Sequence, residues 1–290
     1  MSSVSKNTTK PGRNATAPAR PRHDRVGVSR TAVTEVSGSA ADKYRAPALD
    51  KGLDILELLA QHDGGLTRAE IERALARSSS EIYRMLERLV ARQYVRRSPE
   101  GDRYALSLKL FSLAAWHPPL QRLVSLALPL MHRFSAEAEQ SCHLGVYDRG
   151  NVLVVAQSNS PAAWGLNVRV GATVSLVDTG SGQVLLAFAD AGSRERMLRE
   201  HVEIDGEHRM DDAALQQVLE EVARQGYRQR ESLQSLGVQD ISVPILDHRG
   251  QAIAVLTTPY IQRIDRHAAP ELAQVRERLI GTAQTLSFDG

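Results

Sequence analysis

The chain has 290 residues, a formal net charge of +2, 42% apolar and 24% charged residues. This length can bury a sizeable core and suggests two ordinary domains, while the near-neutral balance neither requires nor excludes a polyanionic partner. The single cysteine, Cys142, excludes an internal disulfide and a thiolate-rich metal site, so we expect a buried structural thiol.

Residues 1–45 have nine Lys and Arg against three Asp and Glu and almost no large apolar side chains, which predicts a disordered basic arm. Such an arm could attract a phosphate backbone nonspecifically or act only as a solubilising tail. A transit peptide is disfavoured because amphipathic periodicity is missing. We expect no membrane partner and a cytoplasmic, nucleoid-associated protein, since no apolar run approaches the ~20 residues of a bilayer span.

Residues 46–106 carry the signals of three short helices and a hairpin. The first helix is expected to be capped by Asp50 and to end at Gly64-Gly65. Its expected apolar face comprises Leu53, Leu56, Leu59 and Ala60. Thr67 and Glu70 have capping-box spacing for a second helix. Strands at 95–97 and 103–106 around Gly101 complete a predicted winged helix-turn-helix.

The third helix follows a serine run and decides the predicted function of this domain. Its inward positions are Ile82, Met85, Leu86, Leu89 and Val90, which forces an arginine-bearing face outward. In a winged helix-turn-helix this helix enters the DNA major groove. The candidate DNA-binding residues are Thr67, Arg77, Ser78, Ser79, Ser80, Tyr83, Arg84, Arg88 and Arg103. Because Glu81, Glu87, Glu100 and Asp102 offset the arginines, a solvated helix face or a protein-interaction module remains an alternative.

Residues 107–119 are predicted to form a linker helix that His117-Pro118-Pro119 breaks, and residues 120–290 a second, α+β domain. In that domain we expect a helix restarting at Pro129, a hairpin of strands 142–147 and 152–156, and extended segments around Gly171. An apolar helix follows Thr179-Gly180-Ser181-Gly182, and a second is capped by Asp211 and stops at Gly226. A hairpin of strands 238–246 and 252–258 and a helix over 270–286 complete it.

No catalytic or metal-binding constellation emerges from the pattern. The Gly-Ser-Gly turn can hold an anion but is more often a helix cap, and it has no Lys-Ser/Thr pair of a phosphate-binding loop. His143, His201 and His208 lack metal-ligand spacing and are interpreted as solvated or core histidines. We therefore expect no enzyme activity, no cofactor and no metal.

The order of these signatures resembles the IclR family of bacterial transcription regulators from about residue 48 to 286. The first match is Ile71-Glu72-Arg73-Ala74 followed by Ile82-Tyr83-Arg84-Met85-Leu86. The later matches are Val170-Gly171, Thr179-Gly180-Ser181-Gly182 with Leu185-Leu186-Ala187, Gly226-Tyr227 to Glu231, and Gly237-Val238 to Val243-Pro244. The resemblance implies a winged-helix domain, a linker helix and a GAF-like effector-binding domain, assembled as a dimer or a dimer of dimers.

The resemblance also implies a ligand-responsive regulator that binds double-stranded operator DNA. We expect it to be a repressor of transcription. Its effector would be a small organic, aromatic or sugar-derived acid, or a polyol. The pocket residues carried over are Leu166, Gly180, Ser181, Arg230, Val238, Asp240 and Thr257. The alternatives are a winged-helix protein whose second domain only oligomerises and an α/β enzyme with an incidental helix-turn-helix.

The chain departs from the family pattern at four sites. Ala76-Arg77 replaces a Gly-Leu pair, Ser78-Ser79-Ser80 replaces a Pro-Lys-Ser-like run, Gln183 replaces a lysine, and Asp240 replaces a small hydroxylated residue. An acid at position 240 repels a carboxylate and suits a hydroxyl or an amine, whereas Arg230 favours the opposite charge. The charge of the effector therefore stays open at this point.

Overall fold

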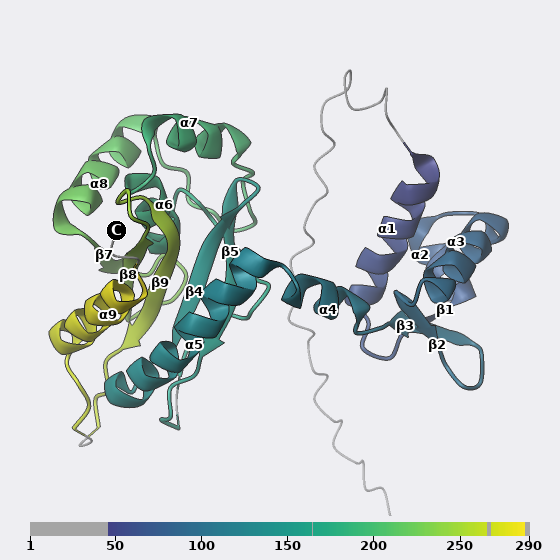
Figure 1. Cartoon of the computed structure of the whole chain (residues 1–290), viewed down its shortest axis with the longest axis horizontal. Helices are drawn as coiled ribbons and strands as arrows, with labels where there is room; N and C mark the ends of the chain where they lie inside the picture. The colour runs from purple at the N-terminus through teal and green to yellow at the C-terminus, as the bar shows by residue number, and fades with distance from the viewer. Residues whose placement is uncertain (1–45, 164, 266–267, 288–290) are drawn as a thin grey trace, which may run out of the picture. The chain divides into compact units, whose positions relative to one another are not determined.

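The computed structural model describes residues 46–163, 165–265 and 268–287, so the arm expected over 1–45 lies outside the described residues. A group of three helices with a three-stranded sheet comes first, and a six-stranded sheet flanked by helices follows (Figure 1). The two regions are described separately below.

The amino-terminal region is the expected winged helix-turn-helix. Its helices are α1 (Pro47–Ala60), α2 (Arg68–Leu75) and α3 (Ser79–Ala91), and its wing is formed by β2 (Val95–Arg97) and β3 (Arg103–Leu106). A further strand, β1 (Leu66–Thr67), pairs with β3 and was not predicted. Two residues are too short for an alternating pattern, so only the pairing reveals this strand.

The first helix differs from the prediction in its start and its buried face. It begins at Pro47 after Ala46, so Asp50 lies in its first turn and does not cap it. Ile55 and Leu59 are buried, while Leu53 and Ala60 are exposed. Apolar residues surround much of this helix, and the side that α2 and α3 cover decides which of them enter the core.

Capping boxes begin the next two helices. Thr67 and Glu70 form the predicted one, with the Thr67 main-chain N–H donating to Glu70 Oε2 at 2.8 Å. Ser78 and Glu81 form the second at the start of α3. The inward face of α3 is as predicted, with Ile82 and Leu86 fully buried. These local bonds satisfy donors that a helix start otherwise leaves unpaired.

The linker segment contains α4 (Lys109–Ala115), and α5 (Pro118–Ala138) begins directly after His117. The expected restart at Pro129 is wrong, because α5 runs unbroken through this proline. A proline inside a helix costs about 3 kcal/mol. Here Ala127, Met131 and Phe134 on the same helix are buried in the core of the second domain, which offsets that cost.

The second domain is built on an antiparallel sheet in the order β6-β5-β4-β9-β8-β7. Its strands are β4 (Cys142–Asp148), β5 (Asn151–Ser158), β6 (Thr173–Val174), β7 (Arg228–Glu231), β8 (Val238–Leu246) and β9 (Ala252–Ile261). Of the two segments expected to be extended around Gly171, residues 168–170 are not a strand, and of residues 174–177 only Val174 belongs to one, β6. The two predicted hairpins, β4 with β5 and β8 with β9, are present.

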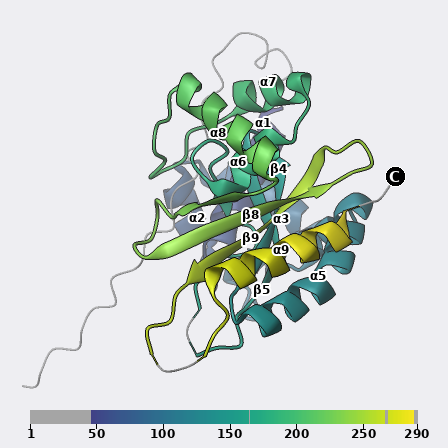
Figure 2. The same ribbon diagram turned by 90° about the vertical axis from the view of Figure 1, so that its left-hand side faces the viewer.

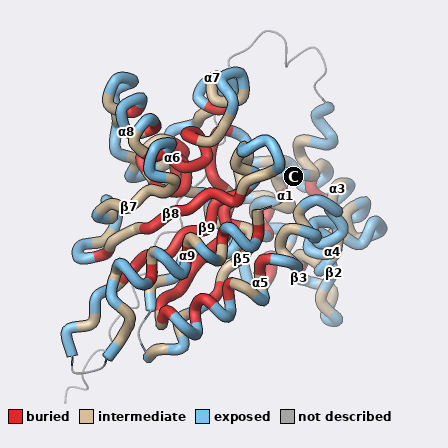
Figure 3. Tube along the Cα trace, turned by 60° about the vertical axis from the view of Figure 1, so that its left-hand side comes forward, coloured by how far each residue is buried: buried red, intermediate tan, exposed pale blue. Residues whose placement is uncertain are grey.

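Helices cover both faces of this sheet (Figures 2 and 3). α5 and α9 (Leu272–Leu286) pack on one face, where Ile241, Val243 and Ile245 of β8 are buried. The other face carries α6 (Gly180–Ala187) and α8 (Asp212–Gln225), with α7 (Ala191–Glu200) beside α6. Asp211 caps α8 as predicted, whereas α7, capped by Asp190, was not predicted.

The first turn of α6 lies very close to the backbone before it. A Cβ atom on Gly182 would stand 2.1 Å from the carbonyl oxygen of Leu176. Gly281 in α9 is a matched position, because a Cβ there would meet nothing within 4 Å.

We therefore expect Gly182→Ala to destabilise the protein by roughly 3 kcal/mol, since the clash is with backbone that must move. Gly281→Ala should stabilise it by up to about 1 kcal/mol, because alanine loses less backbone entropy in a helix. Urea unfolding of both variants checks this. Equal stability of Gly182→Ala and the wild type would show that α6 is not held this close to Leu176.

Candidate DNA interface and effector pocket

The outward face of α3 carries the polar residues predicted for DNA contact. Ser79, Ser80, Tyr83, Arg84 and Arg88 are all exposed. The capping box and the buried pair on the opposite side hold α3 in this orientation. The negative charge of Glu81 on this helix is offset by an ion pair with Lys51. Hydrogen bonds from Lys51 and Ser78 lower the pKa of the Glu81 carboxyl to about 2, so it stays ionised in this pair.

Other predicted residues are engaged within the domain. Arg77 Nη2 donates to Asp54 Oδ2 at 2.7 Å and so ties the turn before α3 to α1. Arg103 Nη1 donates to the carbonyl oxygen of Gly65 at 2.9 Å, which links the wing to the start of α2. The hydroxyls of Thr67 and Ser78 contact the carboxylates of their capping boxes.

Several exposed arginines were not among the predicted DNA-binding residues, and two of them contact other parts of the domain. Arg68, at the start of α2, lies over the ring of Tyr83 with 5.9 Å from its Cζ atom to the ring centroid. Arg97, on the wing, donates from Nε to the carbonyl oxygen of Gly101 at 2.6 Å. Each of these arginines lies directly beside a helix cap or a turn, and that position could have identified it. The sequence analysis relied on helical periodicity, which does not include such positions.

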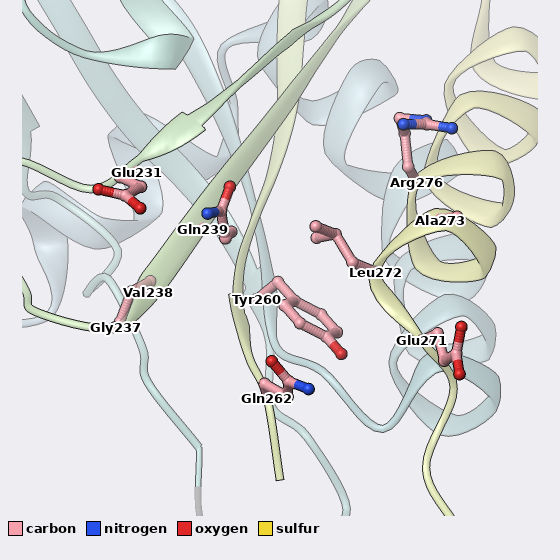
Figure 4. Close-up of a pocket in the computed structure, with 10 residues that line it drawn as sticks. All are labelled: Glu231, Gly237, Val238, Gln239, Tyr260, Gln262, Glu271, Leu272, Ala273 and Arg276. Atoms are coloured by element: carbon pink, nitrogen blue, oxygen red, sulfur yellow. The ribbon is translucent and has the colours of Figure 1, made fainter.

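In the second domain, a cavity of about 310 Å³ lies between the start of α6 and the sheet, and segments 166–169 and 232–235 also line it. Six of the seven predicted effector residues line it: Leu166, Gly180, Ser181, Arg230, Asp240 and Thr257. Val238 does not. It lines a separate groove of about 660 Å³ beside Tyr260 and Leu272 (Figure 4).

Strand register explains the polar floor of the cavity. His143 of β4 pairs with Thr257 of β9, and Thr257 pairs with Ser242 of β8, so three adjacent strands place polar side chains in one row. Thr257 Oγ1 donates to Ser242 Oγ at 2.8 Å and lies 2.8 Å from Ser181 Oγ on α6. The three hydroxyls form a buried relay. Buried polar groups of this kind must be hydrogen-bonded or meet a ligand.

His143 was interpreted as a solvated or core histidine, yet it lines the cavity. Burial lowers the pKa of its imidazole to about 4, so the ring is neutral near pH 7. A neutral ring offers one donor and one acceptor. The alternation of strand 142–147 could have identified it, because Cys142 and Leu144 enter the apolar core on the other face of the sheet.

The charged residues that line the cavity are Arg169, Asp178 before α6, Arg230 on β7 and Asp240 on β8. Burial is the main cause that lowers the pKa of Arg230, and burial likewise raises the pKa of Asp240 against the opposing effects of Ser232 and Arg230. Arg230 Nη1 donates to the carbonyl oxygen of Asp178 at 3.0 Å. Asp178, another residue that was not predicted, is buried and accepts the main-chain N–H of His208 at 2.7 Å.

The start of α6 completes the cavity. Thr179 caps the helix by accepting the N–H of Gly182 at 3.1 Å. A Cβ on Gly180 would stand 2.8 Å from Ser242 Oγ, so only glycine lets this turn approach the sheet so closely. The amino-terminal end of a helix favours negative charge, and the cavity can accept an anionic group there.

Within the described ranges, no set of three or more His, Cys, Asp or Glu side chains is placed to hold a metal ion. None of the helices described for this chain is long and apolar enough to cross a membrane.

A winged helix-turn-helix followed by a domain with a polar cavity defines the two-domain class of DNA-binding regulators.

Two family models match the chain: the IclR helix-turn-helix domain over residues 48–99 and the bacterial transcriptional regulator IclR C-terminal domain over 120–288. The chain belongs to the IclR family of ligand-responsive, DNA-binding transcriptional regulators. It is 29% identical to the transcriptional regulator KdgR of Escherichia coli, covering 72% of this chain and 80% of KdgR. It is 28% identical to BhcR of Paracoccus denitrificans, covering 86% and 89%.

A solved structure supports the same assignment. An IclR homologue from Microbacterium hydrocarbonoxydans, crystallised with 4-hydroxybenzoate, superposes with a TM-score of 0.69 at 25% identity. The alignment covers 83% of this chain and 97% of that one.

The buried imidazole of His143 predicts a pH dependence of stability. Its pKa is about 4 in the folded protein, against about 6.5 in the unfolded chain. Between these values the unfolded chain binds more protons, so the free energy of unfolding falls as the pH drops from 6.5 to 4, by up to roughly 3 kcal/mol. Urea titrations across this range should show His143→Gln to be less acid-sensitive than the wild type; parallel curves would contradict the burial of a neutral ring.

Proposed function

We propose that residues 46–106 bind double-stranded operator DNA and that a small molecule in the cavity of residues 120–290 changes the operator affinity, with residues 107–119 as the linker. The observation that carries this proposal is the cavity itself. Six residues expected to bind effector come from four separate parts of the chain and line one polar space. An effector that prefers one conformation of the protein shifts the balance between conformations with high and low operator affinity.

For the DNA contact, we assign different roles to the predicted residues. Ser79 and Ser80 begin α3 and present hydroxyls at a helix start, while Tyr83, Arg84 and Arg88 follow on the exposed face. These five are the direct contacts to base edges and phosphates in the proposal. Thr67, Arg77, Ser78 and Arg103 hold the α2 start, the turn and the wing in place through their internal bonds.

The regulator acts as a homo-oligomer in this proposal. On α4 and just after it, Phe111 and Trp116 are 73% and 71% exposed, and Leu108 before it is more exposed still. On α1, Leu49 and Leu53 are exposed as well. Exposed large apolar side chains that gather on one segment favour a protein contact there, and a dimer would match an operator with two-fold symmetry. Sedimentation of the full chain as a monomer at micromolar concentration would contradict this.

The cavity suits a small organic acid or a polyol, and a relative was crystallised with 4-hydroxybenzoate. We propose that this chain is a repressor located in the cytoplasm at the nucleoid, and that it is not an enzyme. The polar side chains of the cavity fit recognition, because the Ser181 hydroxyl is bonded to Thr257 and has no base as its hydrogen-bond partner in the described part of the chain.

The proposal is tested by recovering bound genome fragments with the purified protein and titrating them at fixed salt. A discrete site of two-fold symmetry, whose affinity changes with a metabolite made or consumed by the neighbouring genes' products, supports the regulator. Uniform, weak binding to all fragments would refute the DNA assignment. Specific binding that no metabolite alters would favour a second domain that only oligomerises.

The proposal separates arginines that contact DNA from arginines that hold the domain together, and this difference can be tested. Arg84→Ala should reduce operator affinity about tenfold or more and leave the unfolding midpoint unchanged, since a base or phosphate contact is worth about 1–3 kcal/mol. Arg77→Ala should lower the stability of the amino-terminal domain by on the order of 1 kcal/mol, because it breaks the partly exposed ion pair with Asp54. Exposed Arg209 in the second domain is the control, and Arg209→Ala should change neither property.

A further inference from the structure

Arg230 and Asp240 lie directly opposite each other on β7 and β8, and both line the cavity. Among the described residues, no ion pair within 4.0 Å joins them. Arg230 instead donates to the main-chain carbonyl oxygens of Asp178 and Glu231, and the side chain of Ser232 opposes the rise that burial causes in the pKa of Asp240. A cation and an anion thus stand side by side at the cavity, each without a direct contact to an opposite charge.

This arrangement disfavours a simple carboxylate as the ligand. Paired strands lie about 4.8 Å apart, so a carboxylate bound by Arg230 would stand close to the carboxyl of Asp240. Repulsion from Asp240 would then be of the same order as attraction to Arg230. Burial makes the conflict stronger, and the raised pKa of Asp240 reports that its charged form is already poorly solvated.

A ligand with a donor beside its carboxylate removes the conflict. We infer that the effector is a small acid with a hydroxyl or ammonium group next to its carboxylate, which Arg230 and Asp240 recognise as a pair. This inference rests on the proposed function of the cavity and narrows its ligand class. Asp240 becomes the residue that selects for the donor, while Arg230 and the start of α6 bind the carboxylate.

The rest of the cavity fits the remainder of such a molecule. Leu166, Val168, Val174 and Pro259 supply apolar walls for its carbon skeleton. His143 lies two strands from Asp240, on β4, and offers a neutral donor and acceptor. Arg169 is exposed, so it is less shielded from solvent than Arg230. Asp178 accepts the main-chain N–H of His208 with Oδ2, while its buried Oδ1 has no hydrogen-bond partner among the described residues, so it adds a second carboxylate that disfavours a donor-free acid.

The test uses two matched sets of acids that share a skeleton. Mandelate, phenylglycine and phenylacetate form one set, and lactate, alanine and propionate the other; the third member of each lacks the donor. Calorimetric titration of the full chain without DNA should show, in at least one set, that a donor-bearing acid binds at least fivefold more tightly than its donor-free partner. Equal binding of the partners, or no binding of any of the six acids at millimolar concentration, would overturn the inference.

Variants of Asp240 and Arg230 test which residue causes the preference for a donor-bearing acid. Asp240→Asn should reduce the donor preference to within twofold and tighten binding of the donor-free acid, while Arg230→Gln should weaken all members of the set. Glu195→Gln on the exposed side of α7 is the matched control and should change nothing. If Asp240→Asn does not fold, Asp240→Ser, which is also neutral, serves in its place. An unchanged ratio in the neutral variant would exclude Asp240 as the selecting residue.

These outcomes are independent of the operator experiment. A protein that binds donor-free acids equally well and still changes its operator affinity with an effector would refute this inference alone. A protein that binds the donor-bearing acid with the predicted preference, and binds no operator, would refute the proposed function alone.

Discussion

The close approach of α6 to the sheet is the constraint on which the second domain depends. Gly180 stands over Ser242, and Gly182 stands against the backbone of Leu176, at separations that leave no room for a Cβ. Because the first turn of α6 lies this near, Ser181 reaches Thr257 and joins the hydroxyls of two strands. The same approach brings the amino-terminal end of the helix to the cavity, so one packing contact produces the polar floor and also places a helix end that favours negative charge beside it.

The two faces of the sheet serve different purposes. On the side of α5 and α9, alternating residues such as Ile241 and Leu256 form a continuous apolar core. On the side of α6, the apolar cluster around Val255 gives way to His143, Ser242 and Thr257 where the cavity begins. Buried polar groups stabilise a fold less than apolar groups do, so the polar half of this face contributes less to stability than the apolar half.

In the amino-terminal domain, some arginines bond to other elements of the domain and others lie exposed on its surface. Arg77 and Arg103 are bonded to other elements, and those bonds set the turn before α3 and the base of the wing. Arg84 and Arg88 lie on the free face of α3. A residue with a guanidinium can do either, because its fork of donors matches a carboxylate, a carbonyl oxygen or a phosphate equally well. Exposure in the fold, and not residue type, separates the two groups.

The amino-acid sequence by itself determined the elements whose signals are local. The capping box of Thr67 and Glu70, the cap at Asp211 and the inward face of α3 each depend on bonds or periodicity within a few residues, and all are present as predicted. The family motifs likewise identified six of the residues that line one cavity, Gly180 and Asp240 among them. Their order along the chain was sufficient for the fold class.

Only the tertiary structure decided which side chains meet. It kept Pro129 inside α5, buried Ile55 where Leu53 was expected, placed Val238 in a different groove and brought His143 to the cavity. It also showed that Arg230 and Asp240 share the cavity without an ion pair. Each of these outcomes depends on strand register or helix packing between segments far apart in the chain. Local periodicity specifies which side of an element is apolar, but the partner that covers it and the distance of approach are properties of the assembled fold.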